Sequence, residues 1–397
     1  MWANMGNCVL VIFFIVETLI REGWILDGIK IFHVADVHLD APFSLSSVAE
    51  AERCRNSLRS AFASALLTAK MNGAKLFLVS GDLFDGSFVT KDTEEFLVEQ
   101  FGKYRDLKVF ISPGNHDPFN AVSPYANIKF PENVHVFKDK ERVSLPELGV
   151  DVYGFGFTES SCSDCPVLGY PELDKEKINI LVCHGDTSSP LSTYGPITKA
   201  DIAASGFDYV ALGHIHKASD VLCEGGVSYA YPGCIEGRGF DETGYKGGLS
   251  GTVSKGEVSL NPVTLSKHRF EIATVSLDGV CSRTEALERI RSGIRSYNED
   301  TSLRLILEGQ VSEGFIITPD AVGKGYEFPS SIEIVDKTFA APSFTSLEQN
   351  NTLTGVFYKK MIEEIEKTEH GSEEREVLVS ALRYGLAALG GRSLADE

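Results

Sequence analysis

Polar side chains that can bind a metal ion or carry a proton follow five apolar runs of the chain. The runs cover residues 29–35, 74–80, 108–112, 178–183 and 209–212 and are rich in Val, Ile, Leu and Phe, as buried strands are. One such side chain after one run would mean little, but their recurrence after every run indicates a shared site. The residues concerned are Asp36, His38, Asp82, Asn115, His116, His184, His214 and His216.

These residue types favour a pair of divalent cations. Imidazoles, carboxylates and an amide oxygen are ligands of borderline-hard metals, and a two-metal site needs a carboxylate that bridges the ions. We predict that Asp82 is this bridge, because Gly81 before it allows a close approach of the backbone. We assign the other ligands to one ion as Asp36, His38 and His216, and to the second ion as Asn115, His184 and His214.

His116 remains beside this predicted centre without a role as a ligand. A histidine whose unperturbed pKa is about 6.5 can donate a proton to a leaving oxygen, and bound cations would stabilise the charge that builds on phosphorus. Asp117 could orient His116 or serve the loop, and Asp186 could form a turn or support His184. His33 is interpreted as a core residue or as a support of the site.

Helical segments lie between the first three apolar runs. Residues 57–74 place Leu58, Phe62 and Leu66 on one face, and residues 90–104 have apolar side chains at a similar spacing. Strands that alternate with helices predict an α/β fold. The carboxyl ends of its strands would share one edge of a sheet, where residues that are distant in the sequence can converge.

The sequence pattern changes after residue 218. Short alternating runs between residues 226 and 265 are broken by glycine and proline, which predicts β-hairpins. A small α/β unit follows, with a helix whose start is marked by Ser282 and Glu285, and two amphipathic helices come last. We therefore expect an N-terminal extension (1–28), a main domain (29–265), a small capping domain (266–345) and a C-terminal helical segment (346–397).

The composition is that of a globular but acidic protein. The chain of 397 residues is too long for one ordinary core, which predicts two or three domains. Lys and Arg number 37 against 56 Asp and Glu, so the net charge of −19 argues against binding nucleic acid by bulk charge alone. A local basic patch or bound cations could still provide such binding.

The eight cysteines are too sparse for a disulfide scaffold. We therefore expect the protein to work in the reducing cytoplasm. Cys162 and Cys165 have a C-x-x-C spacing, but no second pair or C-x-x-H partner lies nearby. Two loop cysteines are the simpler interpretation, and a zinc or redox site is the alternative.

An apolar segment at residues 8–20 precedes the first expected strand. It is shorter than the about 20 residues of a membrane span, and Glu17 interrupts it. No Lys or Arg precedes it, which argues against a secretory signal. We expect an extra segment outside the main domain and no membrane as a partner; a membrane-associating helix is the alternative.

The order of the polar motifs resembles that of the calcineurin-like metallophosphoesterases. The motifs are D-x-H, G-D, G-N-H-D, an isolated H and G-H-x-H, and the resemblance covers residues 29 to about 265. It implies a four-layer αββα sandwich with two central sheets and a dinuclear metal centre. The family pattern falls on the seven ligands assigned above and on His116 as the catalytic histidine.

A narrower resemblance connects the chain to the DNA-repair exonuclease branch, with SbcD-type and especially YhaO-type members. It rests on "IFHVADVHLDAPF", "GDLFDG", "PGNHDP", "YVALGHIHK" and "YPGCIEGRGFDETGYKG". In that branch the capping domain helps to select DNA, the terminal helices dock on the coiled coil of an SMC-like ATPase, and manganese is commonly used. A homodimer is suggested by the resemblance alone. Asp40 stands where SbcD-type members usually carry glycine, as in YhaO-type members.

The leading hypothesis is therefore an enzyme, a two-metal phosphodiesterase that cleaves DNA together with an ATPase partner. Arg238 and Lys246, in the glycine-rich loop 236–248, could contact the phosphate backbone, or the loop could be purely structural. One alternative is a phosphatase or cyclic-nucleotide phosphodiesterase with the same centre. The other is a weakly catalytic scaffold for the ATPase.

Overall fold

In the computed structural model of this chain, the described residues are 28–43, 48–280, 282–311, 322, 331–340, 352–369 and 372–389. The apolar segment at residues 8–20 lies outside them. The chain divides into two compact units, of which the first ends at Glu271 and includes Asp300–Ser302. Among the helices of the described ranges, none is both long and apolar enough to cross a membrane.

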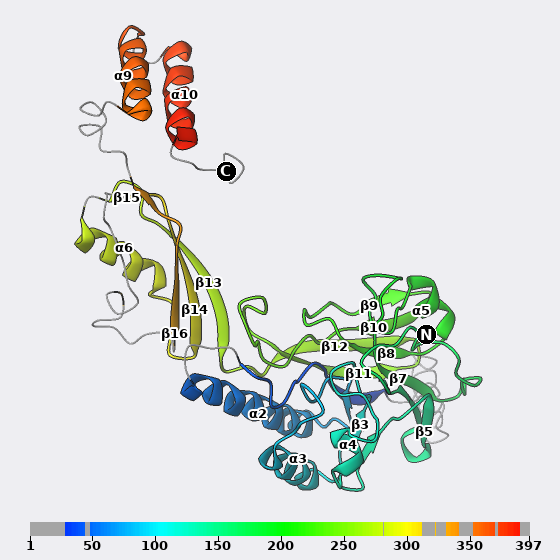
Figure 1. Ribbon diagram of the computed structural model, residues 1–397. Helices are drawn as coiled ribbons and strands as arrows, with labels where there is room; N and C mark the ends of the chain where they lie inside the picture. The colour runs from blue at the N-terminus through cyan, green and yellow to red at the C-terminus, as the bar shows by residue number, and fades with distance from the viewer. Residues whose placement is uncertain are drawn as a thin grey trace, which may run out of the picture. The chain divides into compact units, whose positions relative to one another are not determined.

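Two six-stranded sheets form the first unit (Figure 1). The first sheet consists of β1 (Ile29–Val34), β2 (Leu76–Val79), β3 (Lys108–Ile111), β4 (Val134–Val136), β11 (Gly247–Ser254) and β12 (Glu257–Thr264). The second consists of β5 (Glu141–Leu145), β6 (Val150–Phe155), β7 (Ile178–His184), β8 (Tyr209–Gly213), β9 (Leu222–Glu224) and β10 (Val227–Ala230). The five apolar runs of the sequence are thus β1, β2, β3, β7 and β8.

The strand order brings the carboxyl ends of these strands together. The orders are β12-β11-β1-β2-β3-β4 in the first sheet and β5-β6-β7-β8-β10-β9 in the second. β1, β2, β3 and β4 run parallel to one another, and so do β6, β7, β8 and β10. Each sheet therefore carries the residues that follow its parallel strands along one edge.

Helices cover the outer faces of the two sheets (Figure 1). α2 (Val48–Met71) and α3 (Lys91–Lys103) pack on the first sheet, and α5 (Lys199–Ser205) packs on the second. The short helices α4 (Pro124–Asn127) and η1 (Pro146–Leu148) lie in connections. The predicted α/β fold with its αββα order of layers is confirmed.

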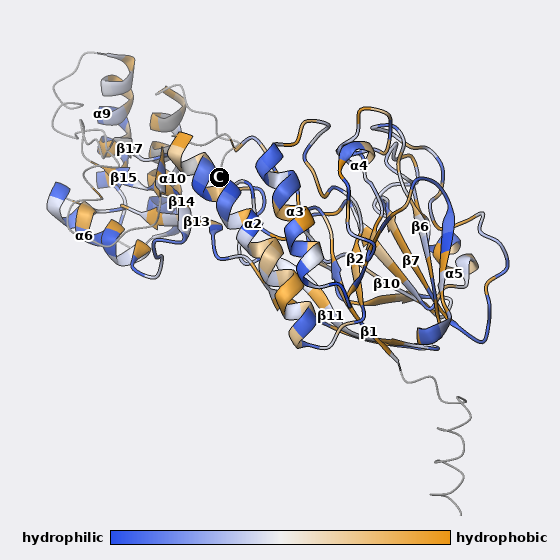
Figure 2. Cartoon of the chain, turned by 90° about the horizontal axis from the view of Figure 1, so that it is seen from below, coloured by the Kyte–Doolittle hydropathy of each residue, from blue (hydrophilic) through white to orange (hydrophobic). Residues whose placement is uncertain are grey.

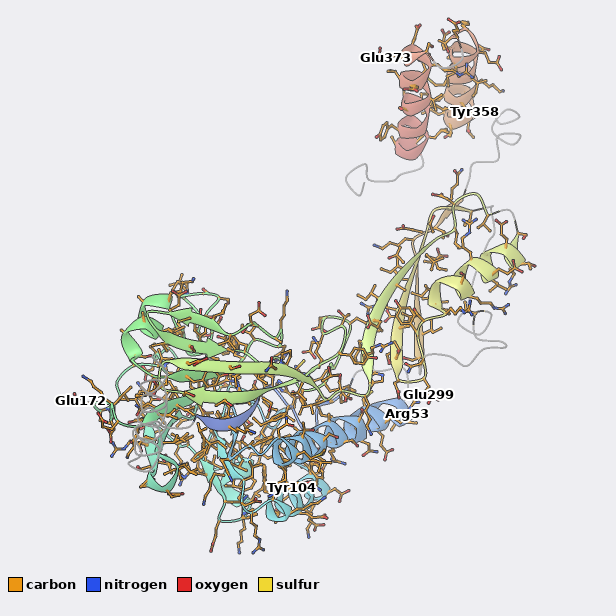
Figure 3. The ribbon with its side chains drawn as sticks, turned by 180° about the vertical axis from the view of Figure 1, so that it is seen from behind. Arg53, Tyr104, Glu172, Glu299, Tyr358 and Glu373 are labelled. Atoms are coloured by element: carbon orange, nitrogen blue, oxygen red, sulfur yellow. The ribbon has the colours of Figure 1, made fainter. Side chains whose placement is uncertain are left out.

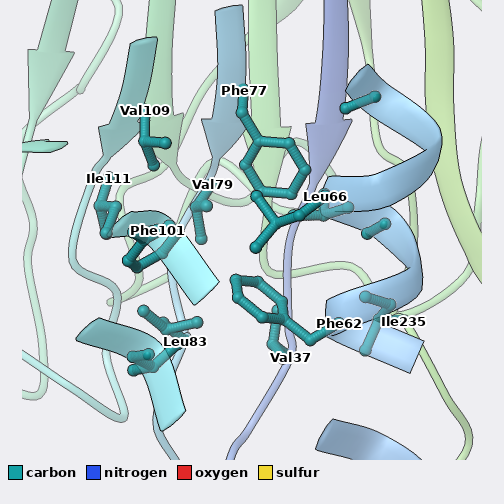
Figure 4. Close-up of a cluster of buried hydrophobic side chains, with 14 of the residues drawn as sticks. Val37, Phe62, Leu66, Phe77, Val79, Leu83, Phe101, Val109, Ile111 and Ile235 are labelled. Carbon is teal, nitrogen blue, oxygen red and sulfur yellow. The ribbon is translucent and has the colours of Figure 1, made fainter. Parts of the chain in front are cut away.

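Alternation of side chains along the strands produces these layers. In β1, Phe32 faces the helices, whereas Ile31 turns to the other side and packs in one core with Ile180 of the second sheet. Phe62 of α2 meets Phe77 of β2 edge to face, with ring centroids 6.0 Å apart, in the outer core drawn in Figure 4. β2 is apolar along its length, and β7 is apolar between Asn179 and its last residue, His184 (Figure 2), as expected for strands that are covered on both faces.

The second unit contains most of a small sheet and a helix that begins at an N-cap serine. β13 (Arg269–Ser276), β14 (Thr301–Glu308) and β16 (Ser331–Asp336) form a three-stranded sheet, and β15 (Gln310–Val311) pairs with β17 (Phe339–Ala340). α6 (Arg283–Ile294) begins where Ser282 accepts a hydrogen bond from the backbone N of Glu285. This is one of the two hydrogen bonds of the capping box that the sequence predicts.

Two helices follow in the same unit, as the sequence predicts. They are α9 (Leu353–Glu366) and α10 (Glu373–Leu389). They pack on each other around Tyr358, Ile365 and Leu382, and Figure 3 shows Tyr358 on α9. Their shared core is small, because among the described residues only these three side chains of the cluster are buried.

Candidate metal centre

The polar side chains that follow the strands converge at one edge of the sandwich. Asp36 and His38 follow β1, and His216 follows β8. The Nε2 atoms of His38 and His216 lie 3.3 Å apart, and Asp36 Oδ1 lies 3.7 Å from His216 Nε2. One ligand atom from each of these residues lies within 4.8 Å of the other two. The structure thus brings together the ligand set predicted for the first ion.

The ligand set predicted for the second ion lies beside the first. His184, the last residue of β7, places Nε2 2.9 Å from Asn115 Oδ1 and 3.5 Å from Asp82 Oδ2. The ring centroid of His214 lies 5.2 Å from that of His184. Asp82 Oδ2 is also 3.8 Å from His38 Nε2. The Asp82 carboxylate therefore lies between the two sets, where a bridging ligand would be needed.

The buried members of both sets attract positive charge. Asp36 and Asp82 are each 1% exposed, and His38 and His184 are not exposed at all. Two carboxylates buried together are unfavourable unless positive charge neutralises them. Burial lowers the pKa of His184, but the charges of Asp82 and Asp36 outweigh burial and raise it above its ordinary value.

The Nδ1 atoms of His38 and His216 contact carboxylates, and these contacts turn the Nε2 atoms of the two rings toward the centre. His38 Nδ1 lies 2.9 Å from Asp85 Oδ1, and His216 Nδ1 lies 2.5 Å from Glu242 Oε1. Because a carboxylate only accepts hydrogen bonds, the neutral His216 ring carries its proton on Nδ1, and the nearby carboxylate of Asp85 favours the same tautomer of His38. The two Nε2 atoms then direct lone pairs at each other across 3.3 Å. This arrangement fits a cation that both nitrogens bind.

His184 has the same orientation in the second set. Its Nδ1 donates to the carbonyl oxygen of Ser80 at 3.0 Å, which leaves Nε2 facing the oxygens of Asn115 and Asp82. Imidazole nitrogens and carboxylate oxygens together suit a divalent ion such as manganese, iron or zinc. The residues present therefore fit a centre of two metal ions.

Backbone strain coincides with the centre. The non-glycine residues with positive φ in the described ranges are Asp36 (50°), His38 (50°), Asp40 (63°), Asp82 (52°) and His214 (106°). Such conformations cost about 1–3 kcal/mol each and persist only where the surrounding structure enforces them. All but Asp40 are predicted ligands, so the fold holds the ligands in place against this cost.

Two glycines leave room for the ligands. Gly81 has a φ of 89°, and a Cβ at this position would lie 2.2 Å from His184 Nδ1. A Cβ at Gly114 would lie 2.2 Å from Asp82 Oδ1. These distances are far below van der Waals contact, so β2 and β3 must be followed by glycine for the ligands to approach.

His116 differs from the buried ligands in its exposure. Its side chain is 42% exposed, and its ring centroid lies 4.8 Å from that of His38. Its Nδ1 lies 3.7 Å from Asp85 Oδ1, and its backbone N donates to Asp82 Oδ1 at 3.0 Å. The imidazole thus borders the centre while remaining accessible to solvent, which a proton donor to a bound substrate requires.

Two further aspartates mainly shape the loops of the centre. Asp117 accepts hydrogen bonds from the backbone N of Gly114 at 2.7 Å and of Phe84 at 3.0 Å, which ties together the loops that follow β3 and β2. Asp186 Oδ1 accepts hydrogen bonds in a turn, while its Oδ2 lies 3.9 Å from His214 Nε2. Asp117 therefore serves the loop, and Asp186 combines a turn with support of a ligand.

The two predicted substrate contacts have different surroundings. Arg238 pairs with Asp85 at 2.9 Å and with Glu242 at 3.3 Å, and its side chain is 22% exposed. Lys246 is half-buried, and its backbone N donates to Ser266 Oγ at 2.8 Å. Arg238 thus holds the two carboxylates that orient His38 and His216. Contact of either cation with a phosphate stays a prediction.

Asp85 and Glu242 are candidate functional residues that the sequence analysis missed. Burial raises the pKa of Glu242, but the hydrogen bond from His216 and the charge of Arg238 outweigh it and hold the pKa at about 2. The carboxylate is therefore ionised and keeps its partner oriented. Asp85 could have been suspected because it follows Asp82 by three residues, whereas Glu242 lies in a glycine-rich loop without a periodic signal.

Asp40, the residue that departs from the SbcD-type motif, joins two elements of the first unit. Its φ of 63° lies in the left-handed region that glycine and aspartate tolerate. Its carboxylate accepts from Thr90 N at 2.7 Å, Thr93 Oγ1 at 2.7 Å and Arg59 Nη2 at 3.0 Å. Thr90 is the N-cap of α3. Asp40 therefore attaches the loop after β1 to the start of this helix.

Replacing Asp40 with glycine is expected to lower the free energy of unfolding by about 1–3 kcal/mol. Glycine relieves the backbone strain, but it leaves the partly buried Arg59 and the backbone N of Thr90 without their acceptor. Urea unfolding followed by circular dichroism measures the change. Asp40→Asn, which keeps the shape of the side chain, should lose less. A glycine variant as stable as the wild type would contradict this role of the carboxylate.

An aromatic side chain borders the second ligand set on its solvent side. Tyr194 is 38% exposed, and its ring centroid lies 5.2 Å from that of His214. The backbone of Cys162 forms hydrogen bonds with the residues on either side of Tyr194, at 2.7 Å each.

Burial raises the pKa of the thiols of Cys162 and Cys165, which disfavours the thiolate that zinc or redox chemistry needs.

Comparison with known proteins finds one matching family and several similar proteins. Residues 29–218 match the sequence profile of the family described as calcineurin-like phosphoesterase. The chain is 28% identical over 366 residues to an uncharacterized metallophosphoesterase, YhaO, of Bacillus subtilis (strain 168), with 87% of this chain and 88% of that protein covered. Among solved structures, TT1561 of Thermus thermophilus is 14% identical (TM-score 0.38), with 59% of this chain and 99% of that chain covered. A dimetal phosphatase from Danio rerio is 9% identical (TM-score 0.35), with coverages of 60% and 100%.

The matched residues include all seven predicted ligands and His116. They also contain the five strands whose ends form the candidate centre. The sequence match agrees with two structural observations. The domain has two sheets flanked by helices, and imidazoles and carboxylates converge at one edge of these sheets. Residues 29–218 of this chain therefore resemble a calcineurin-like phosphoesterase domain in sequence and in the residues of the candidate centre.

Proposed function

We propose that this protein is a phosphodiesterase that works with two divalent metal ions, which we expect to be manganese, and that its substrate is DNA. The proposal is carried by the lone pairs of His38 and His216, which face each other beside the buried carboxylates of Asp36 and Asp82. When bound there, two ions would activate a water molecule and stabilise the charge that develops on phosphorus.

The residues of the chain have distinct roles in this reaction. Asp85 and Glu242 hold the rings of His38 and His216 with Nε2 toward the centre, as carboxylates commonly do for metal-binding histidines. His116 is the group that can hand a proton to the leaving oxygen, because it is exposed and lies outside both ligand sets. The ions would also provide the positive charge that the chain, with a net charge of −19, lacks overall.

The rim of the centre supports a substrate that carries bases. Tyr194 presents an exposed ring next to His214 and is held by backbone hydrogen bonds on both sides. Stacking of a base on an aromatic side chain contributes about 1–3 kcal/mol to binding. A nucleotide next to the scissile bond could therefore gain affinity from this residue.

The C-terminal helices support a protein partner. Val356 of α9 and Val377 of α10 are 45% and 63% exposed, and Leu353 is 73% exposed. Apolar side chains exposed together on neighbouring elements are typical of interaction surfaces. We therefore retain the coiled coil of an SMC-like ATPase as the proposed partner of this segment.

The test of this function is a manganese-dependent assay with purified protein. Bis-p-nitrophenyl phosphate should be hydrolysed and linear DNA degraded, and a chelator should stop both reactions. Hydrolysis of mono-p-nitrophenyl phosphate alone would favour a phosphatase, and metal binding without turnover would favour the scaffold. Repeating the DNA assay with an SMC-like ATPase present shows whether the partner changes the rate.

Replacement of Tyr194 with alanine is expected to raise KM for a thymidine dinucleotide about tenfold or more, since a stacking platform would be lost. kcat should change little, because the residue is not a predicted ligand. Dinucleotide hydrolysis followed by chromatography gives both constants, and Tyr194→Phe serves as the control that keeps the ring. An alanine variant with the KM of the wild type would exclude stacking at this position.

A further inference from the structure

A chain of buried hydrogen bonds lies behind the candidate metal centre and takes no part in the function proposed so far. His33 Nδ1 lies 2.9 Å from Tyr209 Oη, and His33 Nε2 lies 2.9 Å from Ser80 Oγ. Ser80 Oγ also donates to the carbonyl oxygen of Ala211 at 2.9 Å. His33, Tyr209 and Ser80 are not exposed at all. Polar groups in such a position must find partners inside the protein.

The carbonyl oxygen of Ala211, at the end of this series of hydrogen bonds, determines which atom carries the proton in each of the others. The carbonyl of Ala211 can only accept, so the hydroxyl of Ser80 must donate to it. Ser80 Oγ then accepts from His33 Nε2–H, and His33 Nδ1 accepts from the hydroxyl of Tyr209. Burial lowers the pKa of His33 to about 3, so its ring is neutral at physiological pH. Each group thus has one role, and none is left without a partner.

The chain joins the two sheets through an otherwise apolar interior. His33 belongs to β1 and Ser80 follows β2 in the first sheet, whereas Tyr209 and Ala211 belong to β8 in the second. The side chains around it, such as Ile180, form the hydrophobic core between the sheets. Replacing both partners of a buried hydrogen bond by apolar groups of the same shape can leave stability nearly unchanged, so a role in the centre is considered beside a role in stability.

Ser80 connects this chain to the metal centre. Its carbonyl oxygen accepts the hydrogen bond from His184 Nδ1 at 3.0 Å, which turns Nε2 of that ring toward Asp82. Its backbone N donates to the carbonyl of Val34 at 3.0 Å. Ser80 also lies two residues before Asp82, whose backbone is held at a φ of 52°. A shift of Ser80 would therefore move a ligand on each sheet.

We propose that His33 is a positioning residue of the metal centre, which fixes Ser80 between the two sheets and thereby sets the place and the ring orientation of His184. The inference rests on the two-ion centre proposed above. Its expected consequence is a lower affinity for metal when the hydrogen-bonded chain is cut. Residues that support a ligand in this way typically contribute 10–100-fold in metal affinity.

The experiment separates this role from a purely structural one by a double substitution. His33→Phe leaves the hydroxyl of Tyr209 buried without its partner and should lower the melting temperature. The double variant His33→Phe/Tyr209→Phe removes both partners, so the melting temperature should recover in large part. If His33 positions the centre, the affinity for Mn²⁺ in the double variant should stay about tenfold or more below that of the wild type.

Two measurements are made on the full-length protein. Calorimetric titration with MnCl₂ gives the affinity for metal, and thermal unfolding gives the melting temperature. Ser80→Ala should show the same loss of affinity, because it cuts the connection at the centre. Ile180→Val is the control, since it perturbs the same core without removing a hydrogen-bonding group and should keep the affinity of the wild type. A double variant with wild-type affinity would overturn the inference and leave the proposed function intact. A wild-type protein that binds no Mn²⁺ would overturn both.

Discussion

Replacing His116 with alanine is expected to lower kcat for bis-p-nitrophenyl phosphate by about 10²–10⁴-fold, the usual contribution of general acid catalysis. Metal affinity should stay at the wild-type level. The reason is positional, because His116 belongs to neither ligand set and its contact with Asp82 is made by the backbone N, which alanine retains. Release of p-nitrophenolate gives kcat, and calorimetric titration with MnCl₂ gives the affinity.

A surface histidine of the same domain provides the matched control for this substitution. His135 has a side chain that is 38% exposed, similar to the 42% of His116, and it pairs with Glu141 at 3.2 Å. His135→Ala should therefore leave kcat and metal affinity unchanged. A His116→Ala variant with an unchanged rate would contradict the role of proton donor. Loss of metal binding in that variant would instead make His116 a ligand.

Replacing Asp82 with alanine is expected to abolish both metal binding and turnover. Asp82 Oδ2 lies 3.5 Å from His184 Nε2 and 3.8 Å from His38 Nε2, so its loss removes a carboxylate that lies between the two ligand sets. Burial raises the pKa of Asp82, but the neighbouring histidines, first His184 and then His38, outweigh burial and keep the carboxylate ionised. The loss of affinity should exceed the 10–100-fold that is typical of supporting residues.

Asp151 is the matched control for this variant. It is also a buried aspartate, but its hydrogen-bond and ion-pair partners are not residues of the centre. It is not exposed, and it pairs with Lys177 at 2.9 Å and accepts from Ser144 Oγ at 2.6 Å. Asp151→Ala should lower the stability but keep the titration with MnCl₂ at two ions per chain. Two ions bound by Asp82→Ala would show that another group bridges the metals.

Much of the fold could be predicted because its signal is local. A buried parallel strand is a short apolar run, and a helix on a sheet has apolar residues at a spacing of three and four. The sequence pattern nonetheless places the start of α2 too late, at residue 57 instead of Val48. Among the described side chains of its first turns, those buried are Ala51 and Cys54, and such small side chains give a weak periodic signal.

The candidate ligands could also be predicted, since the end of a parallel strand fixes which edge of the sheet a residue occupies. Asp36, Asp82 and His184 each lie at or shortly after such an end, and the structure brings them within 4.8 Å of one another. The sequence pattern assigns Asp36 to one ion alone. In the structure it borders the groups of both ions, which is a matter of side-chain geometry in three dimensions.

The chemistry of the motif at residues 115–117 was determined by the sequence, whereas the division of labour within it was decided by the tertiary structure. Asn115, His116 and Asp117 are adjacent but have different contacts. Asn115 contacts the predicted ligand His184, His116 borders the centre on its solvent side, and Asp117 accepts hydrogen bonds from two backbone N–H groups. The same holds for Glu242 and His33, whose partners lie 26 and 176 residues from them in the sequence. Strand ends and residue types are local properties that a chain carries in its order. Hydrogen-bond partners are chosen only when two sheets pack, because packing alone decides which distant groups share a dry interior.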